Sequence, residues 1–261
     1  MAQALWVGKT GLEAQQSRLS VISNNLANAS TTGFKRDRVL FEDLLYQNIR
    51  HAGGQTSQDT ELPSGLSLGT GVQMVATQKL HSQGNVLQTQ NPYDMAIQGY
   101  GFFQVLHPNG NMAYSRNGEF QINGEGQIVT SSGYSLQPAI VVPPNAMSVS
   151  IGKDGVVSIT LPGQPELNQI GQIQLATFQN PSGLTAVGEN LFVETAASGA
   201  PQVGAPGGNG LGTVIQGSLE GSNVNVVEEL VNMIETQRAY EMNSKAISTM
   251  DQMLQYLNNN T

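Results

Sequence analysis

Apolar residues recur every seven positions at both ends of the chain. Near the start, this repeat consists of Leu5, Leu12, Leu19 and Leu26, with Gly8, Gln15, Ile22 and Ala29 at the second seam position. Near the end, it consists of Val226, Met233, Tyr240, Ile247 and Leu254, with Leu230, Ala239, Ala246, Met250, Met253 and Leu257 widening the stripe. A heptad repeat is typical of helices that pair as a coiled coil. We therefore expect a core helix within residues 1–33 and another within residues 222–261.

Residues at the ends of these segments predict where each helix starts or stops. The first helix should fray near Asn28, and Gly33 can adopt the left-handed conformation that follows a helix C-terminus. For the second helix, Asn225 can cap the N-terminus, with Glu228 three residues later in capping-box register.

Between Gln88 and Leu219 the pattern changes to short apolar runs separated by turn residues. The runs lie at 101–106, 119–122, 127–130, 139–142, 147–151 and 156–161. Four dipeptides are hairpin signals, namely Asn109-Gly110, Asn117-Gly118, Asn123-Gly124 and Asp154-Gly155. Such dipeptides accept positive φ angles at low cost, as tight hairpin turns require. We expect a mainly-β outer domain over residues 76–221.

Residues 34–75 follow neither pattern, and we interpret them as a linker region with an extended hairpin-like segment. Phe41 to Tyr46 could form one short helical turn, whereas residues 51–71 are polar and rich in Gly, Ser and Thr, with a helix-breaking Pro63. A structureless stretch of about 20 residues is uncommon in a compact domain. The linker is therefore either disordered or packed against something other than its own domain. The predicted fold class is α+β: two paired terminal helices, an inserted mainly-β domain and an extended linker.

Composition excludes several classes of function. The chain has 11 Lys and Arg against 19 Asp and Glu, which argues against a nucleic-acid-binding surface, and it has no Cys for disulfides or thiolate metal sites. Its apolar runs are far shorter than the roughly 20 residues that span a bilayer, so we expect no direct membrane insertion. The N-terminus lacks the basic and apolar regions of a cleavable secretory signal.

The sequence gives only weak signals for catalytic residues. The three histidines, His51, His81 and His107, match no metal-ligand spacing and read as surface or hydrogen-bonded residues. Gly99-Tyr100-Gly101 lacks the third glycine of a dinucleotide-binding fingerprint. We therefore predict no catalytic residue, no cofactor and no metal site.

The apolar stripe of the C-terminal helix is wider than two-helix packing needs. Surplus apolar surface on a helical rod predicts association, and a repeated contact that does not close gives a helical filament. Opposite charge also favours contact between the ends, because residues 1–50 carry six basic and four acidic side chains and residues 222–261 carry two and five. The predicted self-assembly core consists of Leu5, Leu12, Leu19, Ile22, Leu26, Val226, Leu230, Met233, Tyr240, Ile247 and Leu254.

Three segments resemble one protein family. Residues 23–35, Ser-Asn-Asn-Leu-Ala-Asn-Ala-Ser-Thr-Thr-Gly-Phe-Lys, are similar to the N-terminal signature of the bacterial flagellar basal-body rod and hook proteins. Residues 222–246 resemble their C-terminal motif, and residues 94–103 resemble the entry to their β domain. The motif residues in this sequence are Asn24, Asn25, Leu26, Asn28, Gly33, Phe34 and Lys35.

The resemblance implies a structural subunit rather than an enzyme. It implies export through the flagellar type III apparatus without a cleaved signal, and polymerisation into a rigid hollow helical tube that crosses the periplasm in the basal body. Such a tube passes exported subunits and transmits motor torque. The implied partners are copies of the chain itself, proximal rod and hook subunits, ring bushing proteins and the export apparatus.

Within the family, length and residues 46–69 favour the distal-rod type of subunit. That stretch resembles a linker that stiffens the rod, with Tyr46, Leu62, Pro63, Ser64 and Gly65 as its rigidity residues. Alternatives are a proximal-rod or hook-type subunit and, from other classes, an extracellular β-domain adhesin or an enzyme with a converging polar pocket. An adhesin or an enzyme should not need its heptad ends for function.

Overall fold

The chain forms two units in the computed structural model, which describes residues 2–51, 55–57, 60–61, 64–163 and 167–259. The helix unit consists of residues 1–27, 37–78 and 225–261, and the β unit consists of residues 28–36 and 79–224. The predicted α+β fold, with paired terminal helices and an inserted β-rich domain, is confirmed.

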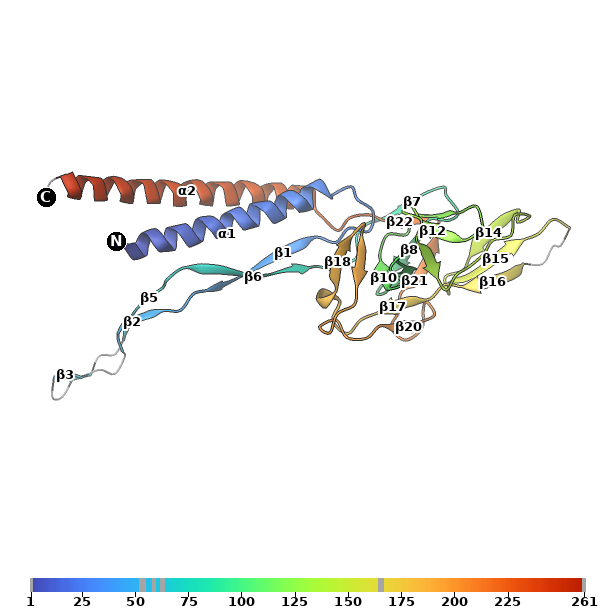
Figure 1. Ribbon diagram of the computed structural model, residues 1–261, viewed down its shortest axis with the longest axis horizontal. Helices are drawn as coiled ribbons and strands as arrows, with labels where there is room; N and C mark the ends of the chain where they lie inside the picture. The colour runs from blue at the N-terminus through green and yellow to red at the C-terminus, as the bar shows by residue number, and fades with distance from the viewer. Residues whose placement is uncertain (1, 52–54, 58–59, 62–63, 164–166, 260–261) are drawn as a thin grey trace. The chain divides into compact units, whose positions relative to one another are not determined.

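Two long helices of the helix unit lie side by side and run in opposite directions (Figure 1). They are α1 (Ala2–Ala27) and α2 (Val226–Asn259). Asn225 caps α2 as predicted, because its Oδ1 accepts the backbone N–H of Val227 at 3.1 Å. The expectation for Gly33 was wrong: it adopts a φ of 70° but lies six residues beyond α1, so it does not cap that helix.

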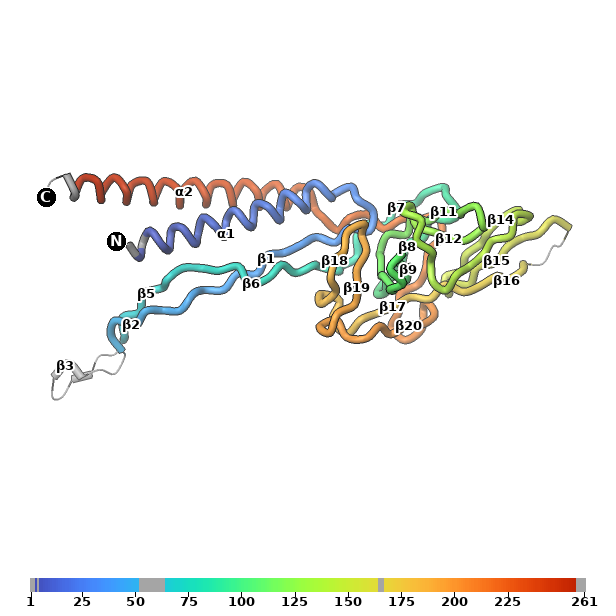
Figure 2. Tube along the Cα trace, in the orientation of Figure 1, coloured from blue at the N-terminus to red at the C-terminus, as the bar shows by residue number. Residues whose placement is uncertain are grey.

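The linker region forms a two-stranded ribbon. In Figure 2 its coloured part is a pair of traces labelled β1, β2, β5 and β6. Its strands are β1 (Asp37–Asp43) paired with β6 (Val72–Lys79), β2 (Gln47–Arg50) with β5 (Leu66–Leu68), and β3 (Gln55–Ser57) with β4 (Thr60–Glu61). The predicted helical turn at 41–46 was therefore wrong. The described part of residues 51–71 forms paired strands instead of being disordered. Pairing between segments distant in sequence satisfies the backbone groups and overrides the local signals.

The β unit is built from short strands that pair in antiparallel fashion. The main sheet has the order β11-β12-β13-β9-β10-β19-β18, and β17 pairs with both β9 and β20. These strands are β9 (Phe102–Leu106), β10 (Met112–Ser115), β11 (Phe120–Ile122), β12 (Ile128–Thr130), β13 (Ser135–Gln137), β17 (Leu175–Thr177), β18 (Thr185–Gly188), β19 (Leu191–Val193) and β20 (Gln202–Gly204). Phe103, Val105, Phe120, Leu136 and Leu175 are fully buried in its core.

Three further sets of strands complete the β unit. A three-stranded sheet contains β14 (Ser148–Ile151), β15 (Val156–Thr160) and β16 (Asn168–Gln172), and a short 3-10 helix spans Pro181–Gly183. The unit's last strands pair with its first: β21 (Thr213–Gln216) with β8 (Met95–Gln98), and β22 (Ser218–Glu220) with β7 (Val86–Gln88). The chain therefore enters and leaves the β unit through adjacent segments.

Five of the six predicted strand runs match observed strands. The exception is 139–142, where only an isolated bridge joins Val141 to Gln127. Pro138 precedes this run and Pro143 follows it, and a proline has no N–H to donate to a ladder.

The predicted turn dipeptides divide into three cases. Gly110 and Gly155 adopt the expected positive φ angles of 79° and 78°. In the β11–β12 turn the positive φ lies at Gly126 instead of Gly124. Asn117-Gly118 is not a hairpin turn at all, because β10 and β11 do not pair; Gly118 instead lies against the backbone carbonyl of Met95.

Candidate self-assembly site

Small residues bring α1 and α2 into close contact. A Cβ built on Gly8 would lie 2.9 Å from Cγ1 of Ile247, and one built on Gly11 would lie 3.3 Å from Nδ2 of Asn243. A glycine lets a neighbouring side chain approach the helix backbone, because it presents no Cβ. Gly8 was assigned to this seam by the heptad; Gly11 and Asn243 were not. The two helices therefore approach each other closely at Gly8 and Gly11, and the contact includes a polar side chain, Asn243, that the heptad repeat does not predict.

The predicted assembly residues differ in their exposure. Ile22 is buried, and the half-buried members are Leu5, Leu12, Leu19, Leu26, Met233, Ile247 and Leu254. Val226, Leu230 and Tyr240 are exposed by 42%, 42% and 39%. These three are therefore accessible to another molecule. Their role in assembly stays a prediction.

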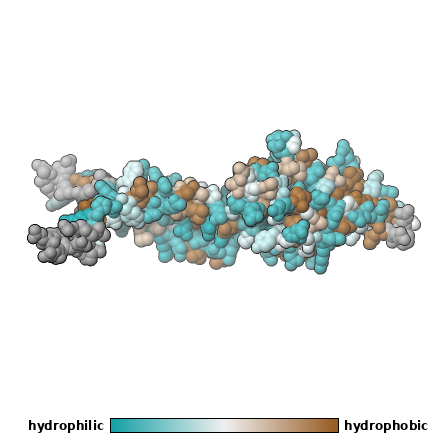
Figure 3. Space-filling model, turned by 90° about the horizontal axis from the view of Figure 1, so that it is seen from below, coloured by the Kyte–Doolittle hydropathy of each residue, from teal (hydrophilic) through white to brown (hydrophobic). Residues whose placement is uncertain are grey.

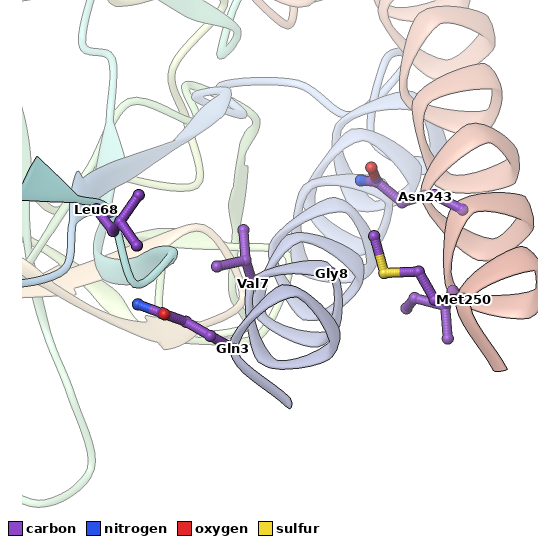
Figure 4. Close-up of a pocket in the computed structure, with 9 residues that line it drawn as sticks. Gln3, Val7, Gly8, Leu68, Asn243 and Met250 are labelled. Atoms are coloured by element: carbon purple, nitrogen blue, oxygen red, sulfur yellow. The ribbon is translucent and has the colours of Figure 1, made fainter. Parts of the chain in front are cut away.

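Apolar side chains also line the outer surface of α2. Val227, Val231, Ile234, Met242, Met253 and Tyr256 are all exposed. A groove in the same unit lies between α1, α2 and β5; Figure 4 shows Val7, Leu68 and Met250 lining it. In the surface view, apolar patches alternate with polar ones (Figure 3). The helix unit thus has more apolar surface than the contact between its two helices covers.

The family-motif residues at 24–35 act within the chain. Asn25 forms a pair of hydrogen bonds with the backbone of Asp37, its Nδ2 donating to the carbonyl and its Oδ1 accepting the N–H, both at 2.9 Å. Leu26 is half-buried on α1, and Asn24 is exposed. Asn25 therefore fixes the first residue of β1 against the last turns of α1.

The rest of the motif lies in the β unit, where it contacts both neighbouring and distant residues of the sequence. The Thr31 hydroxyl donates to Oδ1 of Asn28 at 3.1 Å, and the Lys79 ammonium lies 5.3 Å from the ring centroid of Phe34. Gly33 donates its N–H to the backbone carbonyl of Glu220 at 2.8 Å. A Cβ on Gly33 would overlap the backbone N of Asn117, so no other residue fits there without displacement.

Lys35 belongs to a buried ionic cluster. Its Nζ lies 2.5 Å from Oε1 of Glu220, and Nη1 of Arg116 lies 3.1 Å from Oε2 of the same carboxylate. Burial lowers the pKa of both Lys35 and Arg116, and the Glu220 charge opposes that shift. Neither Arg116 nor Glu220 is recognisable from sequence. Glu220 is 185 residues from Lys35 and 104 residues from Arg116, and no local pattern links residues so far apart.

The proposed rigidity residues lie on or near the ribbon. Tyr46 is 56% exposed and its ring faces Gly69, and Ser64 and Gly65 are also exposed. Leu62 and Pro63 lie outside the described residues. Residues 65–69 also read Gly-x-Ser-x-Gly, the pattern of a hydrolase nucleophile elbow. An elbow needs a strand-to-helix turn, whereas Ser67 is exposed within β5 opposite Asn48.

Comparison with known proteins decides the family. Three family models match: residues 5–35 match "Flagella basal body rod protein", residues 96–159 "Flagellar hook protein FlgE/F/G D1 domain", and residues 215–260 "Flagellar basal body rod FlgEFG protein C-terminal". The flagellar basal-body rod protein FlgG of Buchnera aphidicola subsp. Schizaphis graminum is 58% identical, over 98% of this chain and 99% of the relative. FlgG of Caulobacter vibrioides is 51% identical, over 97% of each chain.

The chain belongs to the FlgG family of flagellar basal-body rod proteins. The resemblance seen in the sequence is thereby confirmed, and with it the structural rather than enzymatic role. A hook-basal body complex protein, FlhP of Bacillus subtilis, is more distant at 28% identity over 99% of each chain. The FlgG relatives therefore match better than this other member of the wider family.

Among the described residues, no group of three or more His, Asp or Glu side chains is arranged to hold a metal ion. Over the same part of the chain, neither helix has the length and apolarity that a membrane crossing requires.

His81 makes the stability of the β unit depend on pH. Its ring lies 5.4 Å from the rings of both Phe102 and Phe192, edge to face. Burial lowers its pKa to about 4, with further lowering by the charges of Lys35, Arg116 and Lys79, partly opposed by a hydrogen bond with the Pro181 backbone. The unfolded value is about 6.5, so the unfolded chain binds the proton more readily.

This stabilisation is fully present above about pH 6.5 and is lost as pH falls toward 4, by up to about 3 kcal/mol. Urea unfolding of the β unit, followed by tyrosine circular dichroism at several pH values, measures it. His81→Gln should flatten the dependence between pH 6.5 and 4. Identical pH profiles for His81→Gln and the natural chain would contradict the assignment.

Proposed function

We propose that this FlgG-family chain is the structural subunit of the flagellar distal rod. Copies polymerise into a rigid hollow helical tube, which transmits motor torque to the hook and passes exported subunits. The subunits contact one another through α1 and α2, at the predicted assembly residues.

The observation that carries this proposal is the apolar surface that α2 leaves uncovered. Val227 is 69% exposed, and Val231 and Ile234 are each 50% exposed, one helical turn apart. Met253 and Tyr256 extend the exposed apolar residues toward the C-terminal end of the helix. Within the part of the chain that the structure describes, this surface is exposed, and neighbouring copies in a polymer can cover it.

We infer the other partners and the location from family membership. Proximal rod and hook subunits would contact the two ends of the tube, ring bushing proteins would surround it in the periplasm, and the export apparatus would deliver its subunits. The family model over residues 96–159 carries the name of hook protein as well as FlgF and FlgG, which supports contacts among related subunits.

Electron microscopy of the concentrated protein tests this function. We expect straight helical tubes with a central channel. Protein that stays monomeric at high concentration, in analytical ultracentrifugation and in micrographs, would refute the self-assembly.

Deleting residues 46–69 should give a more bendable tube. The ribbon beyond β1 and β6 exposes Tyr46, Ile49 and Leu66, which can wedge between neighbouring subunits and block compression. The deletion leaves the remaining ribbon intact, because the Thr70 hydroxyl already donates to the Leu45 carbonyl at 2.6 Å and the Leu44 N–H donates to the Gly71 carbonyl at 2.9 Å. Filament curvature in micrographs gives the persistence length.

A flexible Gly-Ser segment of the same length in place of residues 46–69 is the matched control for chain length. It should bend as readily as the deletion, because it restores length without the ribbon's apolar contacts. A straight, stiff tube from the deletion variant would refute the stiffening role.

A further inference from the structure

The β unit is completed by a short segment at its C-terminal end. Residues 213–223 contain β21 and β22, which pair with β8 and β7. Asn223 follows them and bridges three backbone sites. Its Oδ1 accepts the N–H of Arg36 at 2.7 Å, and its Nδ2 donates to the carbonyls of Leu80 at 2.8 Å and Ser82 at 3.2 Å.

Glu220 provides the negative charge that both cations of the buried ionic cluster contact. The Lys35 and Glu220 side chains are fully buried, and that of Arg116 is 4% exposed. The Glu220 carboxylate also accepts the Gly84 N–H at 2.9 Å. Without Glu220, two cations would remain in the interior, facing the carbonyl groups of Ser82, Ile97 and Gly99 and, for Arg116, the Phe102 ring. An uncompensated buried charge is strongly destabilising, and here there would be two.

This cluster joins segments from the whole length of the unit. Lys35 lies in the stretch that follows α1, Arg116 lies directly after β10 in the main sheet, and Glu220 ends β22. Arg116 also donates to the carbonyls of Ile97 in β8 and of Gly99 just beyond it. The main sheet and the two terminal pairs of strands therefore depend on the same carboxylate.

We propose that residues 213–223 are the closing segment of the β unit, and that residues 28–212 reach their native fold only when Glu220 enters between Lys35 and Arg116. A consequence rests on the proposed function: in a subunit exported as an extended chain, holding this one segment extended keeps the whole β unit unfolded. Release of the segment then allows the unit to fold in one step.

Native-state hydrogen exchange of the full-length Glu220→Gln variant tests the proposal. Exchange protection of amides in β9, β12 and β13 should fall on the order of a hundredfold, and by the same factor as in β21 and β22. The matched control, Glu125→Gln, removes a carboxylate from an exposed turn and should leave protection unchanged. Loss of protection confined to β7, β8, β21 and β22, or no loss, would overturn the proposal.

A measurement on the natural chain covers the case in which Glu220→Gln fails to fold. At low guanidinium concentrations, amides of β21 and β22 should exchange through the same opening as those of β9 and β13, with one denaturant dependence. Separate opening of β21 and β22 at lower denaturant, with β9 and β13 still protected, would overturn the proposal. Tube formation is not involved in either experiment, so failure of the closing segment and failure of the self-assembly are distinguishable.

Discussion

Replacing Ile247 by Asp is expected to abolish polymerisation. Ile247 packs against the bare backbone of Gly8, so a carboxylate there would be held against α1 without a charged partner among the contacts described. Placing an unpaired charge in this partly buried contact is unfavourable and weakens the pairing of the two helices. The helices should separate and the surfaces that meet other subunits should lose their geometry. Sedimentation and electron microscopy at concentrations where the natural chain forms tubes measure the effect.

Ser248→Asp is the matched control, because it adds the same charge to the next residue, which is exposed on α2. It should leave helix pairing intact, as judged by hydrogen exchange in α1. Leu19→Asp, in the half-buried part of α1, should reproduce the Ile247→Asp defect while the β unit stays folded. Tubes at the normal critical concentration from Ile247→Asp would contradict a helical core.

Replacing Gly118 by Ala is expected to unfold the β unit. A Cβ at this position would lie 1.5 Å from the carbonyl oxygen of Met95, a separation that no small adjustment relieves. The contact is backbone against Cβ, and the Met95 N–H is held by the Gly118 carbonyl at 3.0 Å. We expect a loss of about 3 kcal/mol or more, since overpacking at a rigid backbone contact is among the costliest substitutions.

Gly124→Ala is the matched control, because it also follows an asparagine and was predicted to occupy the same kind of turn. No atom lies within 4 Å of a Cβ built on Gly124, and its φ is not positive. Its stability should therefore change by less than about 1 kcal/mol. Chemical unfolding followed by tyrosine circular dichroism compares the two variants; equal midpoints would rule out the close contact at Gly118.

The difference between these two glycines shows what local sequence can predict. An Asn-Gly dipeptide signals a turn because of the φ angles that the two residues tolerate. It does not show whether another backbone passes within contact distance, as Met95 does at Gly118. Likewise, Lys35 could be singled out by resemblance, but its partner Glu220 is 185 residues away and is specified only by the pairing of β22 with β7.

The helices were predictable because their signal is periodic and local. The heptad placed Ile22 and Ile247 at positions that do lie inward or half-inward. It also counted Val226, Leu230 and Tyr240, which are exposed, because a wide stripe does not reveal which edge meets the partner helix. For the ribbon, only an extended hairpin-like segment was expected, because its strands are short and their pairing joins residues that are distant in the sequence.

Neutral amides hold together much of what joins distant parts of each unit. Asn25 binds both backbone groups of Asp37, Asn223 spans Arg36 and Leu80, and the Asn190 amide donates to the Thr32 carbonyl at 3.0 Å. The screening length is about 10 Å at 0.1 M salt, and dissolved ions weaken ion pairs that are exposed to solvent. An amide hydrogen bond carries no net charge, so salt does not screen it in this way. The ionic cluster at Glu220 is buried, which shields it from dissolved ions. These contacts should therefore keep their strength from dilute to concentrated salt.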